Sequence, residues 1–572
     1  MASKSLEPSL MPRSAVDQGL IMAGSFATGY VAGAAAARVL GALPVIGATA
    51  VLRLAGVTAT AARSNRLLRR LDDSTVGSDD DISAWTEVGI DVLESVSLAH
   101  AVSRRRRAVF EAATVAAVAV PSGLEAHAAL GTRTDEVDAT YLAAASGTAV
   151  GIVALSAALV AAVRASGRLA RKATDTSGIV GALVSSGAIL GAIGILGIGG
   201  KVALGRVIGS IAQGNQATES AYADSPRSPN VSGGEHSLIP YETLGLQGRR
   251  LVSEVTPVAT IEAVMGEPAL AEPVRVFVGV QSAKSTEEQV ELAIRELRRS
   301  GGFDRSSILA CSPAGTGYVN YITVEAAELM SRGDIATVAI QYGNLPSMLS
   351  MNKVDHASKL YGALVKRLRV EIDTLDRDIS LYAYGESLGA KTSQIGLDRI
   401  SIDSDPPVDG ALWVGTPYGT EMFERLTAEG VAVFDSPSQL HEYLADGSPR
   451  PEVVFLNHDN DPVAKFTPTM FCAMPDWLKT PDRGRGMNPH QRWLPGIAFW
   501  QGIIDTKNAA TVVPGEFRST GHDYRSDLAS FVQVAYAFDD VTADQMERIE
   551  AKLRASEIER AENIAQGKVQ SA

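Results

Sequence analysis

A chain of 572 residues is too long for one ordinary hydrophobic core, so its length predicts two or more domains. The formal net charge of −13 excludes a basic surface spread over the whole protein, and no nucleic-acid partner is expected. The two cysteines, Cys311 and Cys472, exclude a disulfide-rich scaffold and a CxxC metal site. A single disulfide between them stays open, but two separate buried thiols are expected.

Residues 1–213 are rich in Ala, Gly, Val and Leu and predict a multi-span helical membrane domain. Their uncharged stretches approach the roughly 20 residues that a helix needs to cross a bilayer. A helical bundle buried in a soluble protein is the alternative interpretation. The candidate spans, in chain order, are Gly19–Ala37, Val39–Ala62, Ala108–Leu124, Ala139–Val163 and Ser177–Gly200.

The distribution of charge predicts the orientation of this domain, because loops rich in Lys and Arg stay in the cytoplasm. Residues 62–70, 104–107 and 164–172 are basic, whereas residues 124–138 are acidic. The pattern predicts an integral cell-membrane protein whose C-terminal domain is extracytoplasmic. Lys201 and Arg206 oppose this orientation, since they follow the last span.

A linker rich in Ser, Asn, Pro and Gly is expected at residues 214–240, before an α/β domain at residues 241–540. In that domain β-branched strands alternate with helices, which predicts a mostly parallel sheet with helices on both faces. Residues 541–572 predict a charged helix at the surface. The expected strands are 274–280, 306–311, 335–341, 379–384, 410–415 and 452–456, and the expected helices are 286–300, 322–332, 354–374 and 388–399.

The turn Gly385-Glu386-Ser387-Leu388-Gly389 carries the strongest chemical signal. It follows a predicted strand and precedes a predicted helix, which is the setting of a nucleophile elbow. Such a turn is so tight that the residues two before and two after the serine must be small. The helix N-terminus behind the serine helps to stabilise negative charge. This context predicts Ser387 as a nucleophile, whereas a bare GxSxG can also be a structural turn.

A serine nucleophile needs a base, and in this fold the chain order is serine, acid, histidine. His522 is the last histidine and precedes a predicted helix near 527–537, so it is the expected base. The acid should follow the strand at 453–456, where Asp459 and Asp461 both qualify. Asp461 is preferred because a proline follows it, and Asp459 stays open.

The remaining histidines after the serine have other expected roles. His441 and His490 lie in segments that look inserted and are expected at the surface, and His458 is too close to the acid position. A triad of this kind works without a metal or an organic cofactor, so neither is expected.

An oxyanion hole needs backbone N–H groups near the nucleophile. The amide of Leu388 is one candidate, and Gly315 or Thr316 in the glycine-rich loop 312–318 is the expected source of the other. This loop lacks the Lys-Ser/Thr of a phosphate-binding loop.

On these motifs the chain resembles the actinobacterial membrane-anchored α/β-hydrolases, whose N-terminal region is a multi-span membrane domain. The resemblance covers roughly residues 240–540, and the N-terminal half only in hydropathy and layout. It implies a serine esterase or lipase-like activity with Ser387, Asp461 and His522 as the triad. The matching segments are Arg275–Ser282, Ser312–Val319, Gln341–Ser347, Gly385–Gly389, Asn460–Val463, Pro475–Leu478 and Gly521–Tyr524.

The predicted function is therefore a membrane-anchored serine hydrolase that cleaves carboxylic, lipid-like acyl esters through an acyl-enzyme. Its expected partners are an acyl-ester or lipid substrate and the membrane lipids. Residues 467–510, which are rich in aromatic side chains, are expected to form a cap or lid. Three alternatives stay open: an acyltransferase of the same fold, a non-catalytic binding domain on a membrane bundle, and a transporter formed by the N-terminal spans.

Overall fold

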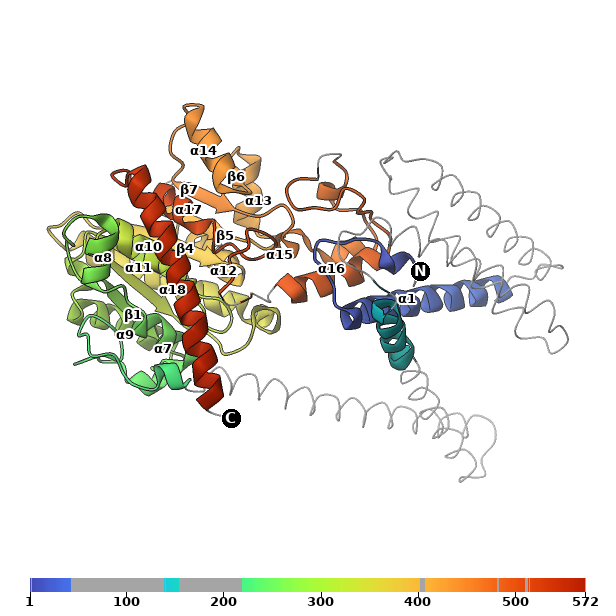
Figure 1. Cartoon of the computed structure of the whole chain (residues 1–572), viewed down its shortest axis with the longest axis horizontal. Helices are drawn as coiled ribbons and strands as arrows, with labels where there is room; N and C mark the ends of the chain where they lie inside the picture. Colours follow the sequence, from blue (N-terminus) through green and yellow to red (C-terminus); the bar gives the residue numbers. More distant parts are fainter. Residues whose placement is uncertain are drawn as a thin grey trace, which may run out of the picture. The chain divides into compact units, whose positions relative to one another are not determined.

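The computed structural model of the chain describes residues 1, 3–42, 138, 140–153, 219–401, 407–480, 483–509, 513 and 515–570 (Figure 1). The chain divides into two compact units. The sheet unit comprises residues 203–464 and 511–572, and the second unit comprises residues 1–202 and 465–510. The predicted spans Ala108–Leu124 and Ser177–Gly200 lie outside the described residues, as does Val39–Ala62 beyond residue 42.

The described part of the sheet unit is built around a seven-stranded sheet with the strand order β1-β3-β2-β4-β5-β7-β6. All neighbouring strands are parallel, which confirms the predicted α/β architecture. Because the strands are parallel, their carboxyl ends lie along one edge, where such sheets place their sites. The strands are β1 (Val274–Val278), β2 (Ser307–Ser312), β3 (Ile335–Ile340), β4 (Ser380–Glu386), β5 (Gly410–Val414), β6 (Val433–Phe434) and β7 (Val453–Leu456).

The helices of the sheet unit fall into two packed groups. In one, α11 (Val354–Asp373) contacts both α9 (Thr286–Arg299) and α12 (Leu388–Ile400). In the other, α10 (Tyr321–Met330) contacts α17 (Leu528–Ala535) and α18 (Ala543–Gln570). These helices match the predicted ones closely. The short elements α7 (Gly245–Ser253), α8 (Val258–Met265), α13 (Glu421–Ala428), α14 (Pro437–Ala445) and β6 were not predicted, because short segments carry little periodicity.

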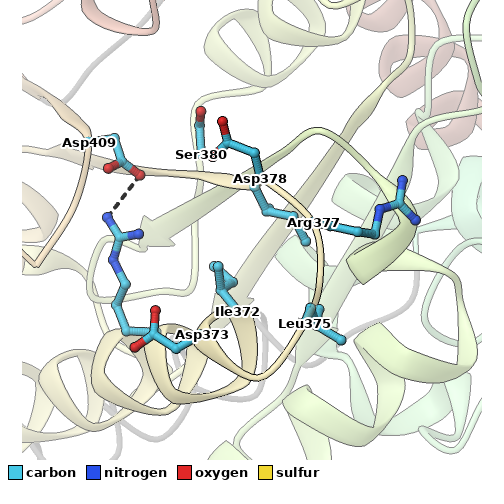
Figure 2. A pocket seen from close by; sticks show the side chains of 9 residues that line it. Ile372, Asp373, Leu375, Arg377, Asp378, Ser380 and Asp409 are labelled. Carbon is cyan, nitrogen blue, oxygen red and sulfur yellow. Dashed lines mark ion pairs between the residues drawn. The ribbon is translucent and has the colours of Figure 1, made fainter.

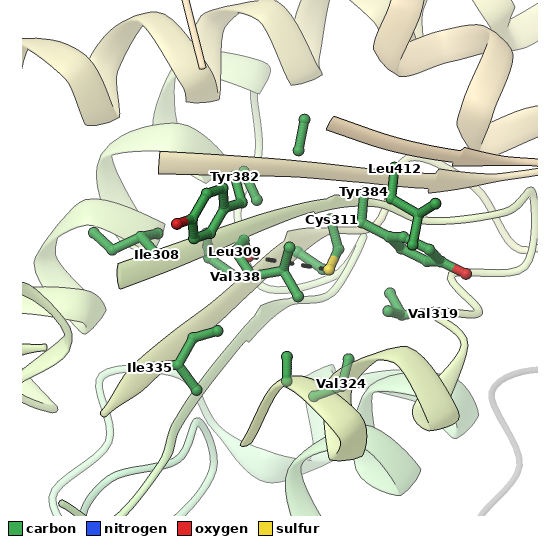
Figure 3. Close-up of a cluster of buried hydrophobic side chains, with 14 of the residues drawn as sticks. Ile308, Leu309, Cys311, Val319, Val324, Ile335, Val338, Tyr382, Tyr384 and Leu412 are labelled. Carbon is green, nitrogen blue, oxygen red and sulfur yellow. Dashed lines mark hydrogen bonds between the residues drawn. The ribbon is translucent and has the colours of Figure 1, made fainter. Parts of the chain in front are cut away.

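The core lies on both faces of the sheet, so most strand side chains are buried without alternation. Figure 3 shows part of it, with Ile308 of β2, Val338 of β3 and Tyr382 of β4. Cys311 is fully buried there, whereas Cys472 in the second unit is exposed, and both are free thiols. The expectation of two buried thiols is therefore wrong for Cys472, because it lies in an exposed surface turn with its two neighbours.

Much of the segment expected to be a linker packs against the sheet unit. Val231 is fully buried and forms a parallel bridge with Arg275 of β1, and Ile239 is also fully buried. The guanidinium of Arg275 is buried too and binds both carboxylate oxygens of Glu328 in α10, at 2.6 and 2.7 Å. The carboxylate of Glu328 thus compensates the charge of Arg275, which would otherwise be costly to bury on this edge strand.

In the second unit, helix α1 (Ala15–Ala42) packs against α16 (Ile497–Ala509). The buried carboxylate of Asp505 accepts hydrogen bonds from the Ser9 hydroxyl and the Leu10 amide, each at 2.9 Å. Burial raises the pKa of Asp505 to about 6. Trp500 also donates its indole N–H to Thr28 at 3.1 Å. The segment expected as a cap thus packs with the N-terminal residues.

The described residues include parts of two predicted spans. Gly19–Ala37 lies within α1, and residues 140–153 of the predicted span Ala139–Val163 are helical. No helix in the described ranges combines the length and the apolar character that a membrane crossing requires.

Candidate active site

Ser387 stands at the turn between β4 and α12. Its φ and ψ are 57° and −125°, a conformation that residues other than glycine rarely adopt. The flanking glycines explain how the turn closes. A Cβ on Gly385 would lie 2.6 Å from the carbonyl oxygen of Gly389, and a Cβ on Gly389 would lie 2.2 Å from that of Ser312. The local sequence thus permits the strained turn that presents Ser387.

His522 and Asp461 form a hydrogen-bonded pair beyond the carboxyl ends of the strands. Asp461 follows β7, and His522 lies in the loop before α17. Nδ1 of His522 lies 2.7 Å from Oδ2 of the fully buried Asp461. The other oxygen, Oδ1, accepts the amide of Val463 at 2.8 Å. The carboxylate therefore holds the imidazole in one orientation and leaves Nε2 for proton transfer.

This pairing distinguishes the two acids that the sequence left open. Asp459 lies on the same loop, but its amide donates to Oδ1 of Asp435 at 2.6 Å, and the carboxylate that hydrogen-bonds His522 is that of Asp461. The reason is geometric, since the loop turns between the two residues and the amide of Asp461 donates to the carbonyl of His458 at 3.0 Å.

Ser387 and His522 approach the same short stretch of backbone at the end of β5. The amide of Ser387 donates to the carbonyl oxygen of Val414 at 2.9 Å. A Cβ on the next residue, Gly415, would lie 2.6 Å from Cε1 of His522. In the described chain the His522 ring hydrogen-bonds Asp461 and not Ser387. Such a serine–histidine contact is often long until substrate binds.

The pKa of His522 is raised above its ordinary value. Burial by itself would lower this pKa, because it penalises the charged imidazolium, but the negative charges of Asp461, Glu386 and Asp523 outweigh that effect. The imidazolium form of His522 is therefore stabilised, and the same charges keep His522 protonated to a higher pH than an exposed histidine.

Tyr524 is a second donor to the carboxylate that orients His522. Its hydroxyl donates to Oδ2 of Asp461 at 2.6 Å, the same atom that faces Nδ1 of His522. The phenol is buried, and burial together with the charge of Asp461 raises the pKa of Tyr524 well above its ordinary value. Tyr524 therefore stays protonated and acts only as a donor to the acid.

The carboxylate next to Ser387 in the chain belongs to Glu386. It accepts hydrogen bonds from Nδ2 of Asn320 at 2.7 Å and from the hydroxyl of Tyr384 at 2.8 Å. Burial raises the pKa of Glu386, and the charge of His522 opposes that rise. Since Asn320 also caps the start of α10, Glu386 ties the loop after β2 to the serine turn.

The amides predicted for an oxyanion hole lie at two backbone segments that touch. Leu388 is the first residue of α12, so its N–H has no acceptor within the helix. Gly315 and Thr316 lie in the loop after β2, and the hydrogen bonds recorded in the described chain do not use their amides. The Thr316 carbonyl accepts Nε2 of Gln341 at 2.7 Å, which steadies the loop. The close contact of Gly389 with Ser312 brings this loop against the start of α12.

Sequence reasoning missed the side chains that join the loop of Asp461 to the loop of His522. Asn460 accepts the amide of Gly521 at 2.8 Å through Oδ1 and donates to the Thr520 hydroxyl at 2.7 Å through Nδ2. Tyr524 was missed as well. Their position next to the acid and the base is visible in the sequence, but a polar loop residue has many possible partners and only the folded loops decide between them.

The other histidines after Ser387 differ in their exposure to solvent. His441 and His490 are exposed, as predicted. His458 is fully buried and contacts the loop that carries His522. Among the residues that the structure describes, no three His, Cys, Asp or Glu side chains gather as a metal site would require.

Neither Ser387 nor His522 lines the two cavities found in the sheet unit. One, of about 380 Å³, lies at the amino end of β4 and is lined by polar side chains that include the ion pair of Arg369 and Asp409 at 2.8 Å (Figure 2). The other, of about 360 Å³, lies beyond the carboxyl ends of β1 and β3 and is lined by Gln341 and Tyr342. Because Ser387 is at the opposite end of β4 from the first cavity, that cavity is not its substrate pocket.

Both the N-terminal and the C-terminal part of the chain match protein-family models. Residues 274–549 match the model of an alpha/beta-hydrolase family, and residues 6–255 match the model of the N-terminal region of an alpha/beta-hydrolase family. Neither the curated proteins nor the solved structures gave a match. The two family models together span nearly the whole chain, and the seven-stranded parallel sheet with its flanking helices is consistent with the alpha/beta-hydrolase fold. The chain therefore belongs to an alpha/beta-hydrolase family.

Proposed function

We propose that the protein is a serine hydrolase that cleaves carboxylic esters, with Ser387, His522 and Asp461 as its catalytic triad. The observation that carries the proposal is the 2.7 Å hydrogen bond between His522 and the buried Asp461, beside a serine held at a positive φ on the strand-to-helix turn. A structural Gly-Ser turn requires neither the buried acid nor the histidine. The approach of Ser387 and of the His522–Asp461 pair to the backbone of Val414 and Gly415 supports a catalytic role for all three.

The reaction follows from the roles of these groups. Oγ of Ser387 attacks the ester carbonyl carbon while Nε2 of His522 takes its proton. The amide of Leu388 and that of Gly315 or Thr316 stabilise the oxyanion. The alcohol then leaves with the proton from His522, and an acyl group stays on Ser387. Water, activated by His522, attacks the acyl-enzyme, and the carboxylic acid departs as the serine recovers its proton.

A fluorophosphonate probe tests this proposal directly, since it labels only an activated serine. We expect the full-length protein to be labelled and Ser387→Ala to be unlabelled. Ser401→Ala is the matched control because Ser401 is exposed at the end of α12, and it should be labelled at the wild-type rate. Labelling that survives in Ser387→Ala, or no labelling of the wild-type protein, would contradict the proposal.

We further propose that the substrate is a lipid-like acyl ester and that the N-terminal region anchors the protein in the cell membrane. This rests on the uncharged stretches of the sequence, above all Ser177–Gly200, and not on any described helix. A membrane anchor would keep the site near acyl chains. The charge pattern favours an extracytoplasmic catalytic domain.

Substrate class and sidedness have separate tests. Hydrolysis of a series of p-nitrophenyl esters should show a kcat/KM that rises with acyl chain length, and a preference for short, water-soluble esters would contradict the lipid-like substrate. An impermeant fluorophosphonate should label Ser387 in intact cells and not in inverted vesicles. The reverse pattern would place the catalytic domain in the cytoplasm, and recovery in the soluble fraction would refute the anchor.

A further inference from the structure

The loop that carries Asp461 and the loop that carries His522 are joined by a second histidine, His458. It is fully buried and lies three residues before the acid. Its Nδ1 lies 2.9 Å from the carbonyl oxygen of Gly521, and its Nε2 lies 2.9 Å from Oδ2 of Asp527. Both contacts reach the segment that carries His522: Gly521 directly precedes His522, and Asp527 lies at the start of α17.

The hydrogen-bond partners of His458 define its protonation state. The carbonyl of Gly521 only accepts hydrogen bonds, so Nδ1 of His458 must carry a proton. Asp527 also receives the hydroxyls of Ser519 at 2.5 Å and Ser526 at 2.9 Å, as an ionised carboxylate does. Nε2 of His458 faces that carboxylate and therefore carries a proton as well. From these partners we infer that His458 and Asp527 form a buried imidazolium–carboxylate ion pair.

The His458 ring also contacts Tyr524, the second donor to Asp461. The two rings stack with centroids 4.0 Å apart, and the amide of His458 donates to the Tyr524 hydroxyl at 3.1 Å. The carbonyl of His458 accepts the amide of Asp461 at 3.0 Å. His458 thus touches residues on both sides of His522 and also holds the backbone of the acid.

We propose that His458 and Asp527 act as a positioning pair, which sets the distance and orientation between His522 and Asp461. The inference rests on the proposed function, because the groups that it positions are those of the proposed triad. Breaking the ion pair should shift the His522 loop, and a displacement of about 1 Å at a catalytic group costs on the order of 100-fold in rate. Ground-state binding should be unaffected, since neither residue belongs to the proposed catalytic groups.

The test compares His458→Gln and Asp527→Asn with the exposed control His441→Gln. Asp527→Asn keeps the size of the side chain and removes its charge, so it folds more readily than a truncation. For each full-length variant, the maximal inactivation rate and the half-saturating concentration of a fluorophosphonate are measured, together with the thermal midpoint. We expect the maximal inactivation rate per folded molecule to fall about 10- to 100-fold in both variants, while the half-saturating concentration of the probe stays unchanged. The control His441→Gln should match the wild-type protein in both quantities.

The double variant shows whether the two residues act together. His458→Gln with Asp527→Asn should be no slower than the slower single variant, because the pair is already broken. Rate losses that multiply, or a lower thermal midpoint with a wild-type rate per folded molecule, would overturn the positioning role. An independent readout is the ¹⁵N spectrum of the histidine rings at pH 7, in which the signal absent from His458→Gln should report two protonated nitrogens. A neutral His458 ring would overturn the ion pair, whether or not the probe labels the wild-type protein. A wild-type protein that is not labelled, but whose His458 ring carries two protons, would refute only the proposed function.

Discussion

The hydroxyl of Tyr524 donates to Oδ2 of Asp461 at 2.6 Å, the same oxygen that lies 2.7 Å from His522. One carboxylate oxygen is thus shared by a phenol and an imidazole. Each donor draws charge from the oxygen, so the phenol weakens the hold of the carboxylate on the imidazole. The pKa of His522 should therefore depend on the hydroxyl of Tyr524.

Tyr524→Phe should raise the pKa of His522 further. The carboxylate of Asp461 would lose a donor and interact more strongly with the imidazolium. Since His522 must be neutral to act as a base, labelling of Ser387 falls as the pH drops through the pKa of His522. The acidic limb of the rate profile should therefore move to higher pH, by up to about one unit. The control is Tyr418→Phe, whose ring is half exposed. An acidic limb that does not move, or that moves to lower pH, would show that the shared oxygen is unimportant.

Asp461→Asn should act in the opposite direction and much more strongly. Burial alone lowers the pKa of His522, and Asp461 is the main charge that reverses this effect. Without it the acidic limb should shift to lower pH, while the maximal rate falls by roughly 10⁴, as expected when the imidazole is no longer held in the productive tautomer. Asp459→Asn is the matched control and should keep both the rate and the profile. If Asp459→Asn were the damaged variant, the assignment of the acid would be wrong.

Gly389→Ala should impair catalysis through the backbone. The added Cβ would lie 2.2 Å from the carbonyl oxygen of Ser312, so the loop after β2 or the start of α12 has to move. We expect a rate loss of roughly 100-fold, because both segments carry the proposed oxyanion donors. Gly151→Ala is a suitable comparison, since its Cβ would meet no described atom within 4 Å. Wild-type esterase or labelling rates in Gly389→Ala would argue against this placement of the oxyanion hole.

Glu557→Gln should reduce stability. Glu557 of α18 is buried and pairs with Arg525, three residues after His522, and its carboxylate also accepts the amide of Gly515 at 3.0 Å. Loss of its charge leaves Arg525 with Asp523 as its remaining charged partner, which should cost about 1–3 kcal/mol. The measurement is the urea midpoint of the full-length protein, followed by circular dichroism. Glu559→Gln, exposed on the same helix, should leave that midpoint in place, and equal midpoints for the two variants would refute the buried pair.

The sequence alone was sufficient to predict the parallel sheet, its principal helices and the turn at Ser387. These features depend on local rules: buried parallel strands are continuously apolar, and a tight strand-to-helix turn requires glycines at fixed spacing. It also narrowed the acid to Asp459 or Asp461, since both follow β7. It could not place the short strand β6 or the packing of Val231 on β1, because those depend on partners distant in the chain.

Only the tertiary structure decided which side chains meet. Asp461 rather than Asp459 reaches His522, Tyr524 shares its carboxylate oxygen, and His458 bridges to Asp527, 69 residues away along the chain. Composition and spacing cannot encode such contacts, because the direction of a side chain at the end of a loop depends on the backbone of the whole turn. The sequence thus determined the kind of site, and the folding of the two loops against each other decided its geometry.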